Sequence, residues 1–336
     1  MAESTTTVPD AADAANDADS DVSEKMRNGR KRSRVAKASL STISDHGKAE
    51  RPQKRFFRQR AHCNPLSRSE GFDYPMSPET MDWATHFPDA SWRARLEDTS
   101  TDSANSGFHS SIIGSSGSAW DSSVDEDTAL ATAAAASQQH QDVFADVGCG
   151  FGGLTVALAN LYPDAISIGF EIRDKVTKYV DQRILHLREE HPGKYQNVSV
   201  MRTNAMRYLP NIFRKAQLTK MFFCFPDPQF KKKKHRRRII SHGLLAEYAY
   251  LLRPGVGRLY HITDVPELHE WMASRCRAHP CFEEINADEA LKNDPAVRCM
   301  IESTEEGKKV ARGGGSKFYA VFRRKLDSYA DVSQLA

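Results

Sequence analysis

The fold is decided by residues 222–238, which read FFCFPDPQFKKKKHRRR. The apolar, aromatic start predicts a buried parallel strand, and the prolines end it because proline fixes φ and lacks a backbone donor. Asp227 therefore stands at the carboxyl end of a strand, the edge where open α/β sheets bind ligands. A carboxylate next to a run of cations suggests chemistry on nucleic acid. The alternatives are a turn-forming Asp and a solvated helix face, so other motifs must decide.

Charge and composition divide the chain into segments. The formal net charge is only +3, but residues 1–24 carry seven acids, and residues 25–60 carry thirteen Lys or Arg against two acids. Residues 1–60 and 97–141 lack apolar periodicity, so we expect a disordered basic tail and a low-complexity insertion. The basic clusters in the tail are either a nuclear localisation signal, nucleic-acid contacts or merely solvated.

The remaining segments are an extended arm over residues 61–96 that packs on the core, a catalytic domain over 142–326 and a C-terminal tail over 327–336. The six cysteines form no C-x-x-C pair and have no zinc spacing, so we expect reduced thiols, no metal and an intracellular protein. No apolar stretch approaches the length of a membrane span, and the acidic N-terminus is not typical of a signal peptide.

A strand, a glycine-rich turn and a helix are predicted over residues 143–161. Glycines let a backbone approach a ligand closely, and a helix N-terminus offers unpaired N–H groups. A second strand over 166–170 ends at Glu171, which is placed to accept hydrogen bonds from a ribose diol. Gly148, Gly150 and Gly153 fit the G-x-G-x-x-G pattern, which does not separate NAD from S-adenosylmethionine. Asp146 and the dense glycine run favour S-adenosylmethionine.

The rest of the core alternates predicted helices and strands. Helices are expected over 174–190, 239–252 and 267–279, and strands over 197–201, 260–264 and 317–322. Asn204, after the third strand, either meets an adenine edge or is a turn residue. Residues 303–309 are expected to be a polar loop that either reaches over the active edge or is solvated.

These motifs resemble the tRNA (guanine-N7)-methyltransferases, a family of the class I, S-adenosylmethionine-dependent superfamily. The resemblance covers residues 61–83 and about 144–324. It is carried by Ala61-His62-x-Asn64-Pro65, residues 146–150, Glu171-Ile172-Arg173, Asn204-Ala205, residues 225–228 with their cationic sequel, and residues 303–307. It implies an α/β, Rossmann-like fold: a doubly wound, mostly parallel seven-stranded sheet with an antiparallel late strand. Cys63, at a variable position of its motif, and the insertion are not explained by it.

The resemblance also implies a site. S-adenosylmethionine would be bound by Gly148, Gly150, Glu171, Ile172, Arg173, Asn204, Ala205, Cys224, Thr304, Glu305 and Glu306. The tRNA would meet His62, Asn64, Lys231, Lys232, Lys233, Lys234, Arg236, Arg237 and Arg238. Asp227 would orient the guanine and stabilise its developing positive charge. It would not abstract a proton, because guanine N7 already has a free lone pair.

By the same resemblance, the expected reaction methylates N7 of the variable-loop guanine at position 46 of tRNA. A WD-repeat β-propeller subunit is the expected partner. The basic clusters of the N-terminal tail make the nucleus the expected location. The alternatives are another class I methyltransferase acting on rRNA, mRNA or protein, a non-catalytic RNA-binding scaffold with this fold, and a nicotinamide dehydrogenase.

Overall fold

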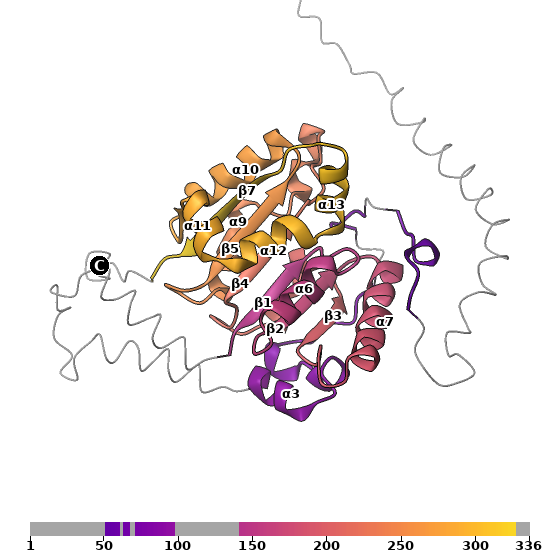
Figure 1. The fold of residues 1–336 in the computed structure, drawn as a ribbon. Coiled ribbons are helices and arrows are strands. Elements are labelled where there is room, and N and C mark those ends of the chain that lie inside the picture. Colours follow the sequence, from indigo (N-terminus) through magenta and orange to yellow (C-terminus); the bar gives the residue numbers. More distant parts are fainter. Residues whose placement is uncertain (1–50, 61–62, 68–70, 98–140, 327–336) are drawn as a thin grey trace, which may run out of the picture. The chain divides into compact units, whose positions relative to one another are not determined.

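The computed structural model describes residues 51–60, 63–67, 71–97 and 141–326 (Figure 1). The strands are β1 (Val143–Val147), β2 (Ile166–Glu171), β3 (Val198–Arg202), β4 (Lys220–Cys224), β5 (Arg258–Thr263), β6 (Phe282–Ile285) and β7 (Phe318–Arg324). The α-helices are α3 (Ala90–Glu97), α6 (Gly153–Leu161), α7 (Asp174–Glu190), α8 (Ala205–Ile212), α9 (His242–Leu251), α10 (Pro266–Arg277), α11 (Ala287–Asn293), α12 (Pro295–Ser303) and α13 (Glu305–Arg312). Short 3-10 helices are η2 (Lys54–Phe56), η3 (Pro78–Thr80), η4 (Trp83–Thr85) and η5 (Lys232–Arg237).

Seven strands of the described chain form one sheet in the order β3-β2-β1-β4-β5-β7-β6. The pairs β1–β2, β2–β3, β1–β4 and β4–β5 are parallel. Strand β7 is antiparallel to both β5 and β6. The predicted doubly wound, mostly parallel sheet with an antiparallel late strand is confirmed. Because β2 and β4 lie on opposite sides of β1, the strand order reverses there, and such switch points are where α/β sheets bind ligands.

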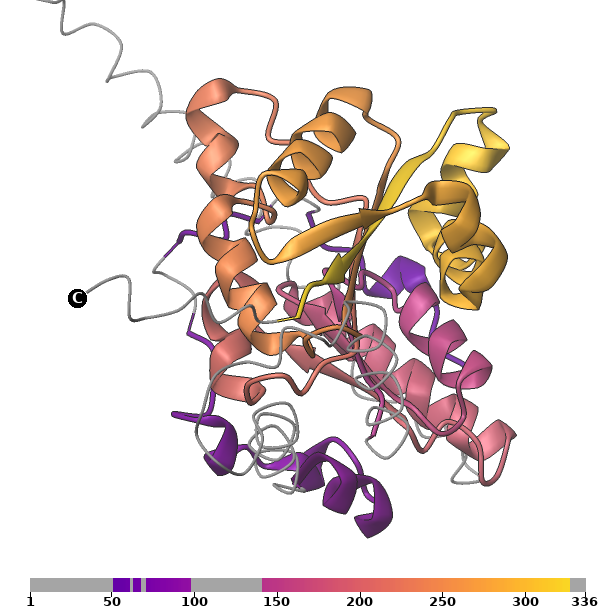
Figure 2. The ribbon, with the colours of Figure 1, turned by 90° about the vertical axis from the view of Figure 1, so that its left-hand side faces the viewer.

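Helices cover both faces of the sheet (Figure 2), and the strand residues alternate between two cores because side chains alternate along a strand. Phe144 and Phe222 join the core that includes residues of α6 and α12. Ala145 and Met221 join the core on the other face, with residues of α8, α9 and α10. With both faces buried, the central strands are apolar almost throughout, as parallel strands usually are.

The segments before the catalytic domain pack on it. Trp83, Phe87 and Leu96 are buried in the core on the face of α8 to α10, and the segment that holds them forms short helices, where an extended arm was expected. The disordered tail predicted over residues 1–60 is too long, because the ring of Phe57 contacts Tyr179 at 5.6 Å between centroids. The predicted insertion over 97–141 lies almost wholly outside the described residues, as do residues 1–50 and His62.

The predicted polar loop over residues 303–309 is wrong. Thr304 is the N-cap of α13, and its Oγ1 accepts a hydrogen bond from Gly307 N at 3.1 Å. Glu305 and Glu306 fill the first helical turn, where acidic side chains are favoured by the helix dipole. Helices α8, α11 and α12 and strand β6 were not predicted. Asn204, Asn286 and Asp294 cap these three helices, so cap residues were the overlooked signal.

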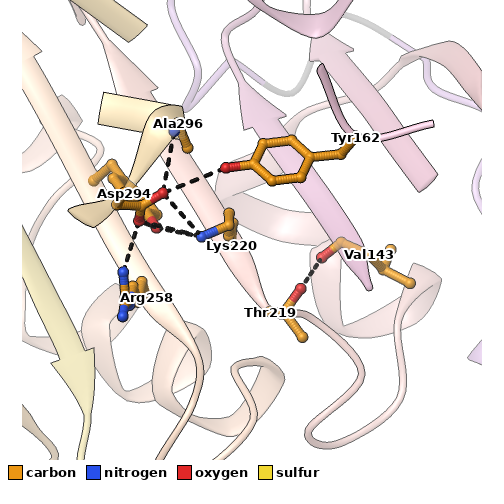
Figure 3. A network of polar contacts seen from close by, with 8 residues as sticks. Val143, Tyr162, Thr219, Lys220, Arg258, Asp294 and Ala296 are labelled. Atoms are coloured by element: carbon orange, nitrogen blue, oxygen red, sulfur yellow. Dashed lines mark hydrogen bonds and ion pairs between the residues drawn. The ribbon is translucent and has the colours of Figure 1, made fainter. Parts of the chain in front are cut away.

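A cluster of polar side chains surrounds the buried Asp294 at the amino ends of β4 and β5 (Figure 3). Its carboxylate accepts from Arg258 at 2.7 Å, from Lys220 at 3.2 Å and from the hydroxyl of Tyr260. Burial raises the pKa of this carboxyl group, but Lys220, Tyr260 and Arg258 outweigh burial and hold the pKa below its usual value. The charge of Asp294 is thus balanced by cations at the amino ends of β4 and β5.

Candidate active site

A cavity lies at the carboxyl ends of β1, β2 and β4, beside the switch point. It is lined by residues that follow these three strands, by the segment after β3, by η5 and by two residues of the arm. The lining residues are Cys63, Pro65, Val147, Gly148, Phe170, Glu171, Ile172, Arg173, Thr203, Asn204, Ala205, Met206, Cys224, Phe225, Pro226, Asp227, Gln229, Arg237 and Ile239. The structure therefore brings Asp227 into one cavity with seven of the eleven residues predicted to bind the cofactor: Gly148, Glu171, Ile172, Arg173, Asn204, Ala205 and Cys224.

The glycine turn opens the backbone toward this cavity. Gly148 has a φ of +78°, a conformation that glycine adopts without strain, and a Cβ built on it would meet no atom within 4 Å. The backbone at Gly148 thus borders open space. Gly150, also predicted to bind the cofactor, is not a lining residue.

Glu171 is 3% exposed and is held by Arg173. Its Oε1 accepts from the backbone N and from Nε of Arg173 at 2.9 and 3.0 Å, and its Oε2 accepts from a guanidinium nitrogen at 2.8 Å. A buried carboxylate needs such a partner, because an unpaired charge in the interior is costly. Arg173 thereby fixes the rotamer of Glu171 at the carboxyl end of β2. Arg173 acts on Glu171 and also lines the cavity itself.

Asn204 connects the cavity to the arm. Its Oδ1 accepts from Met206 N at 3.1 Å and caps α8, while its Nδ2 donates to the carbonyl oxygen of Pro65. Because both ends of the amide are used, Asn204 fixes the position of the arm segment beside the cavity. Pro65 and Cys63, which the sequence did not predict as cavity residues, line it as a result. Asn64 between them is exposed, and its Oδ1 accepts from Leu66 N at 3.2 Å.

The turn that carries Asp227 has a strained backbone. Phe225 and Gln229 have positive φ angles of 49° and 48°, which non-glycine residues seldom adopt. The Oδ1 atom of Asp227 accepts from Gln229 N at 3.2 Å, so the carboxylate orders its own turn. Strained backbone of this kind costs of order 1–3 kcal/mol per residue and is concentrated at functional sites. Gln229 was not predicted as a site residue, although it directly follows the Pro-Asp-Pro motif.

Thr304, Glu305 and Glu306 do not line the cavity. Glu305 instead accepts from Gly153 N at 3.2 Å, pairs with Lys54 at 2.9 Å and lies 3.5 Å from a guanidinium nitrogen of Arg183. It thus satisfies an N–H group at the start of α6 and anchors the segment before the arm. Glu306 pairs with Lys309 at 2.7 Å on the surface.

Asp146 is buried beneath the glycine turn. Its Oδ2 accepts from the hydroxyl of Thr155 at 2.6 Å, and its Oδ1 has no hydrogen-bond partner in the described part of the chain. Burial raises the pKa of this carboxyl group to about 7, with a smaller rise from the nearby charge of Glu305 and a lowering by Thr155. A carboxyl group that titrates near neutrality borders the turn that lines the cavity.

The cationic run does not present all its side chains to solvent. Lys231, Lys232, Lys233 and Arg236 are exposed, and Lys234 is half-buried. Arg238 is 2% exposed: its Nε donates to the carbonyl oxygen of Pro228 at 2.8 Å and its guanidinium pairs with Glu267 at 3.3 Å. The prediction that Arg238 contacts tRNA is wrong, since this side chain fixes the Pro-Asp-Pro turn from inside.

No group of three or more His, Cys, Asp or Glu side chains within the described ranges could hold a metal ion. No helix in the same ranges is long and apolar enough to cross a membrane.

Comparison with known proteins adds the family. A family model described as "Putative methyltransferase" matches residues 140–320. A Zea mays protein named "tRNA (guanine-N(7)-)-methyltransferase" is 50% identical over 278 residues, covering 83% of this chain and 94% of that protein. A Mus musculus protein of the same name is 48% identical over 279 residues, covering 83% of this chain and 93% of that protein.

The solved structure titled "Structure of an antibiotic related Methyltransferase" is 17% identical and covers 60% of this chain and 94% of that chain, with a TM-score of 0.38. A likeness at this TM-score adds nothing to the strand order described above.

The strand order, the cavity at the switch point and the family model together define a Rossmann-like methyltransferase of class I. The chain belongs to the tRNA (guanine-N7)-methyltransferase family, because relatives of that name are about half identical to it over nearly their whole length.

Proposed function

We propose that this protein transfers a methyl group from S-adenosylmethionine to N7 of a guanine in tRNA. The observation that carries the proposal is one cavity at the switch point that Asp227 shares with Gly148 and Glu171. A carboxylate that can hold a base and a glycine turn that can hold a nucleoside cofactor thus border the same space.

The cavity residues fit S-adenosylmethionine. Gly148 leaves backbone open toward a ligand, Glu171 offers a fixed carboxylate to a ribose diol, and Asn204 and Ala205 begin a helix next to it. Asp146 does not line the cavity: it lies buried beneath the glycine turn, where its Oδ2 accepts from the hydroxyl of Thr155. When bound, the cofactor supplies an electrophilic methyl group on a sulfonium centre.

Asp227 positions the other reactant. Its carboxylate can accept from N1–H and the amino group of guanine, which leaves N7 free to receive the methyl group. Methylation puts a positive charge on the ring, and a nearby carboxylate stabilises that charge as it develops. Alignment of two bound reactants supplies on the order of 7–11 kcal/mol in well-oriented systems, so orientation without proton transfer is sufficient.

The tRNA meets the exposed part of the cationic run, Lys231, Lys232, Lys233 and Arg236, together with the basic segment before the arm. Such side chains bind phosphates without reading sequence. We further propose that the target is the variable-loop guanine at position 46, that a WD-repeat β-propeller subunit assists tRNA binding, and that the protein works in the nucleus. Names of the relatives support the tRNA substrate.

The test is methylation of tRNA transcripts by the purified protein, with and without a co-expressed propeller subunit. N7-methylguanine is then mapped by borohydride reduction and aniline cleavage, which we expect to cut at position 46. Transcripts that carry adenosine at that position are the matched control. Methylation of rRNA, mRNA or protein but not tRNA would replace this proposal with another methyltransferase substrate. Binding of NAD without binding of S-adenosylhomocysteine would reject the cofactor.

A further inference from the structure

Three consecutive arginines follow the lysines of the cationic run, and they lie in three different environments. Arg236 is exposed and Arg238 is buried against its own turn, whereas Arg237 is half-buried and lines the cavity together with Asp227. Arg237 makes no hydrogen bond or ion pair with any described residue, and its Nε is fully shielded from solvent. A buried donor without a partner is costly. Arg238 also has one buried guanidinium nitrogen without a partner among the described residues, but its guanidinium pairs with Glu267, whereas Arg237 borders a cavity that can hold a ligand.

Packing of η5 fixes this orientation. The ring of Trp271 in α10 contacts His235 at 5.1 Å between centroids, and the guanidinium of Arg238 lies 4.6 Å from the same ring. Arg238 also donates to Pro228, which ties the end of η5 to the Asp227 turn. His235 and Arg238 are thus held against α10. Arg237, which directly precedes Arg238, lines the cavity.

We infer that Arg237 binds the phosphate group of the target guanine nucleotide, inside the cavity and apart from the exposed cations. Charge determines which part of the nucleotide Arg237 contacts. Methylation makes the guanine ring positive, so a guanidinium against the ring would oppose the reaction, whereas Asp227 favours it. A phosphate has the charge and the geometry that a guanidinium binds best. Arg237 and Asp227 would then hold opposite ends of one nucleotide. This inference rests on the proposed function.

The experiment compares Arg237→Gln with Arg236→Gln, which removes the same charge from an exposed site on the same 3-10 helix. We expect Arg237→Gln to lower kcat/KM for tRNA by about tenfold to a hundredfold, the range for losing a hydrogen bond to a charged group. Arg236→Gln should lower it only a few-fold, because Arg236 is one of several exposed cations that share the binding of tRNA phosphates and its charge is screened by solvent. Affinity for S-adenosylhomocysteine, measured by calorimetry, should stay within about twofold in both variants.

A second measurement identifies the phosphate as the ligand. Guanosine 5′-monophosphate and guanosine are compared as competitive inhibitors of tRNA methylation by the wild type and both variants. We expect the wild type and Arg236→Gln to prefer the nucleotide, and Arg237→Gln to lose that preference. Equal inhibition of the wild type by both compounds, or an unchanged preference in Arg237→Gln, would overturn the inference.

A third variant guards against misfolding. If Arg237→Gln lowers the melting temperature, Arg237→Lys is measured in its place. It retains a cation and should retain part of the nucleotide preference. Complete loss of the preference in a stable Arg237→Lys protein would also overturn the inference. Failure of the wild type to methylate tRNA would reject the proposed function instead. In that case the nucleotide preference is measured directly by binding of guanosine 5′-monophosphate, so the two failures are distinguishable.

Discussion

The two edges of the sheet contain similar charged groups, but the groups are paired at one edge and partly unpartnered among the described residues at the other. At the amino ends of β4 and β5, the carboxylate of Asp294 is paired with Lys220 and Arg258 and bonded to Tyr260. At the carboxyl edge, one oxygen of Asp146 and Nε of Arg237 have no hydrogen-bond partner among the described residues, and the Asp227 turn contains two residues with positive φ. The first edge uses its charges to hold the fold together. The second leaves polar groups for ligands and has the strained backbone.

The largest expected effect is the loss of stability when the carboxylate of Asp294 is removed. Asp294→Ala leaves Lys220 and Arg258 without their carboxylate, and loss of one partner from a buried ion pair costs about 3–5 kcal/mol. Urea unfolding at neutral pH measures this loss, with Asp294→Asn as the matched control that retains shape but not charge. At a temperature where the variant is folded, its affinity for S-adenosylhomocysteine should be unchanged. A weakened cofactor affinity in the folded variant would show that the two edges are not independent.

Asp227→Ala should have the opposite profile. We expect turnover with saturating tRNA to fall by about 100-fold or more, which corresponds to about 2.7 kcal/mol of transition-state stabilisation. The free energy of unfolding should change little, because Asp227 is only half-buried and its hydrogen bond from Gln229 N lies within its own turn. Single-turnover methylation assays with Asp227→Asn beside the alanine variant separate charge from hydrogen bonding. Normal turnover by Asp227→Ala would remove Asp227 from the mechanism.

Glu171→Ala tests the cofactor half of the cavity. A charge-assisted hydrogen bond contributes roughly 1.5–3 kcal/mol, so the affinity for S-adenosylhomocysteine should fall by about 10-fold to 150-fold. Glu171→Gln retains an acceptor and should lose less. Arg173 loses its ion pair in both variants, so Arg173→Gln is measured as well to separate ligand contact from positioning. Calorimetry that finds unchanged affinity in Glu171→Ala would exclude the ribose contact.

The smallest predicted effect concerns His261 in β5, a fully buried residue whose two ring nitrogens have no partner among the described residues. Burial, with a smaller contribution from His269, lowers the pKa of this imidazole to about 3. As the pH falls, His261 is therefore protonated in the unfolded chain at a higher pH than in the folded chain. Stability is lost as the pH falls from about 6.5 toward 3. At pH 5 the expected loss is about 2 kcal/mol, because each unit of pKa difference corresponds to about 1.4 kcal/mol.

His261→Phe removes this contribution while keeping a ring beside Phe322, which stacks on His261 at 6.0 Å between centroids. Urea unfolding at pH 7 and pH 5 should show a smaller difference for the variant than for the wild type. The other histidines whose pKa is lowered by burial, His86, His269 and His279, are present in both proteins and cancel in the comparison. An equally steep fall in the variant would mean that His261 does not carry the pH dependence.

The sequence by itself determined where the central strands end and which residues stand at their carboxyl ends. Prolines after Phe225 stop β4, glycines after Val147 end β1, and Glu171 ends β2, because backbone restriction and side-chain alternation are local properties. Asp227, Gly148 and Glu171 could thus be placed at one sheet edge before any contact was known. The helix that begins at Glu305 was missed, although its Thr304 cap is also a local signal.

Only the tertiary structure decided which role each of several chemically identical residues has. Arg236, Arg237 and Arg238 are chemically identical neighbours, and their exposed, cavity-lining and buried positions follow from how η5 packs on Trp271 of α10. Likewise, Glu305 meets Gly153 N and Lys54 from distant parts of the chain, and Asn204 meets Pro65. No local pattern encodes these contacts, because each depends on two segments that come together only when the sheet and its helices are assembled.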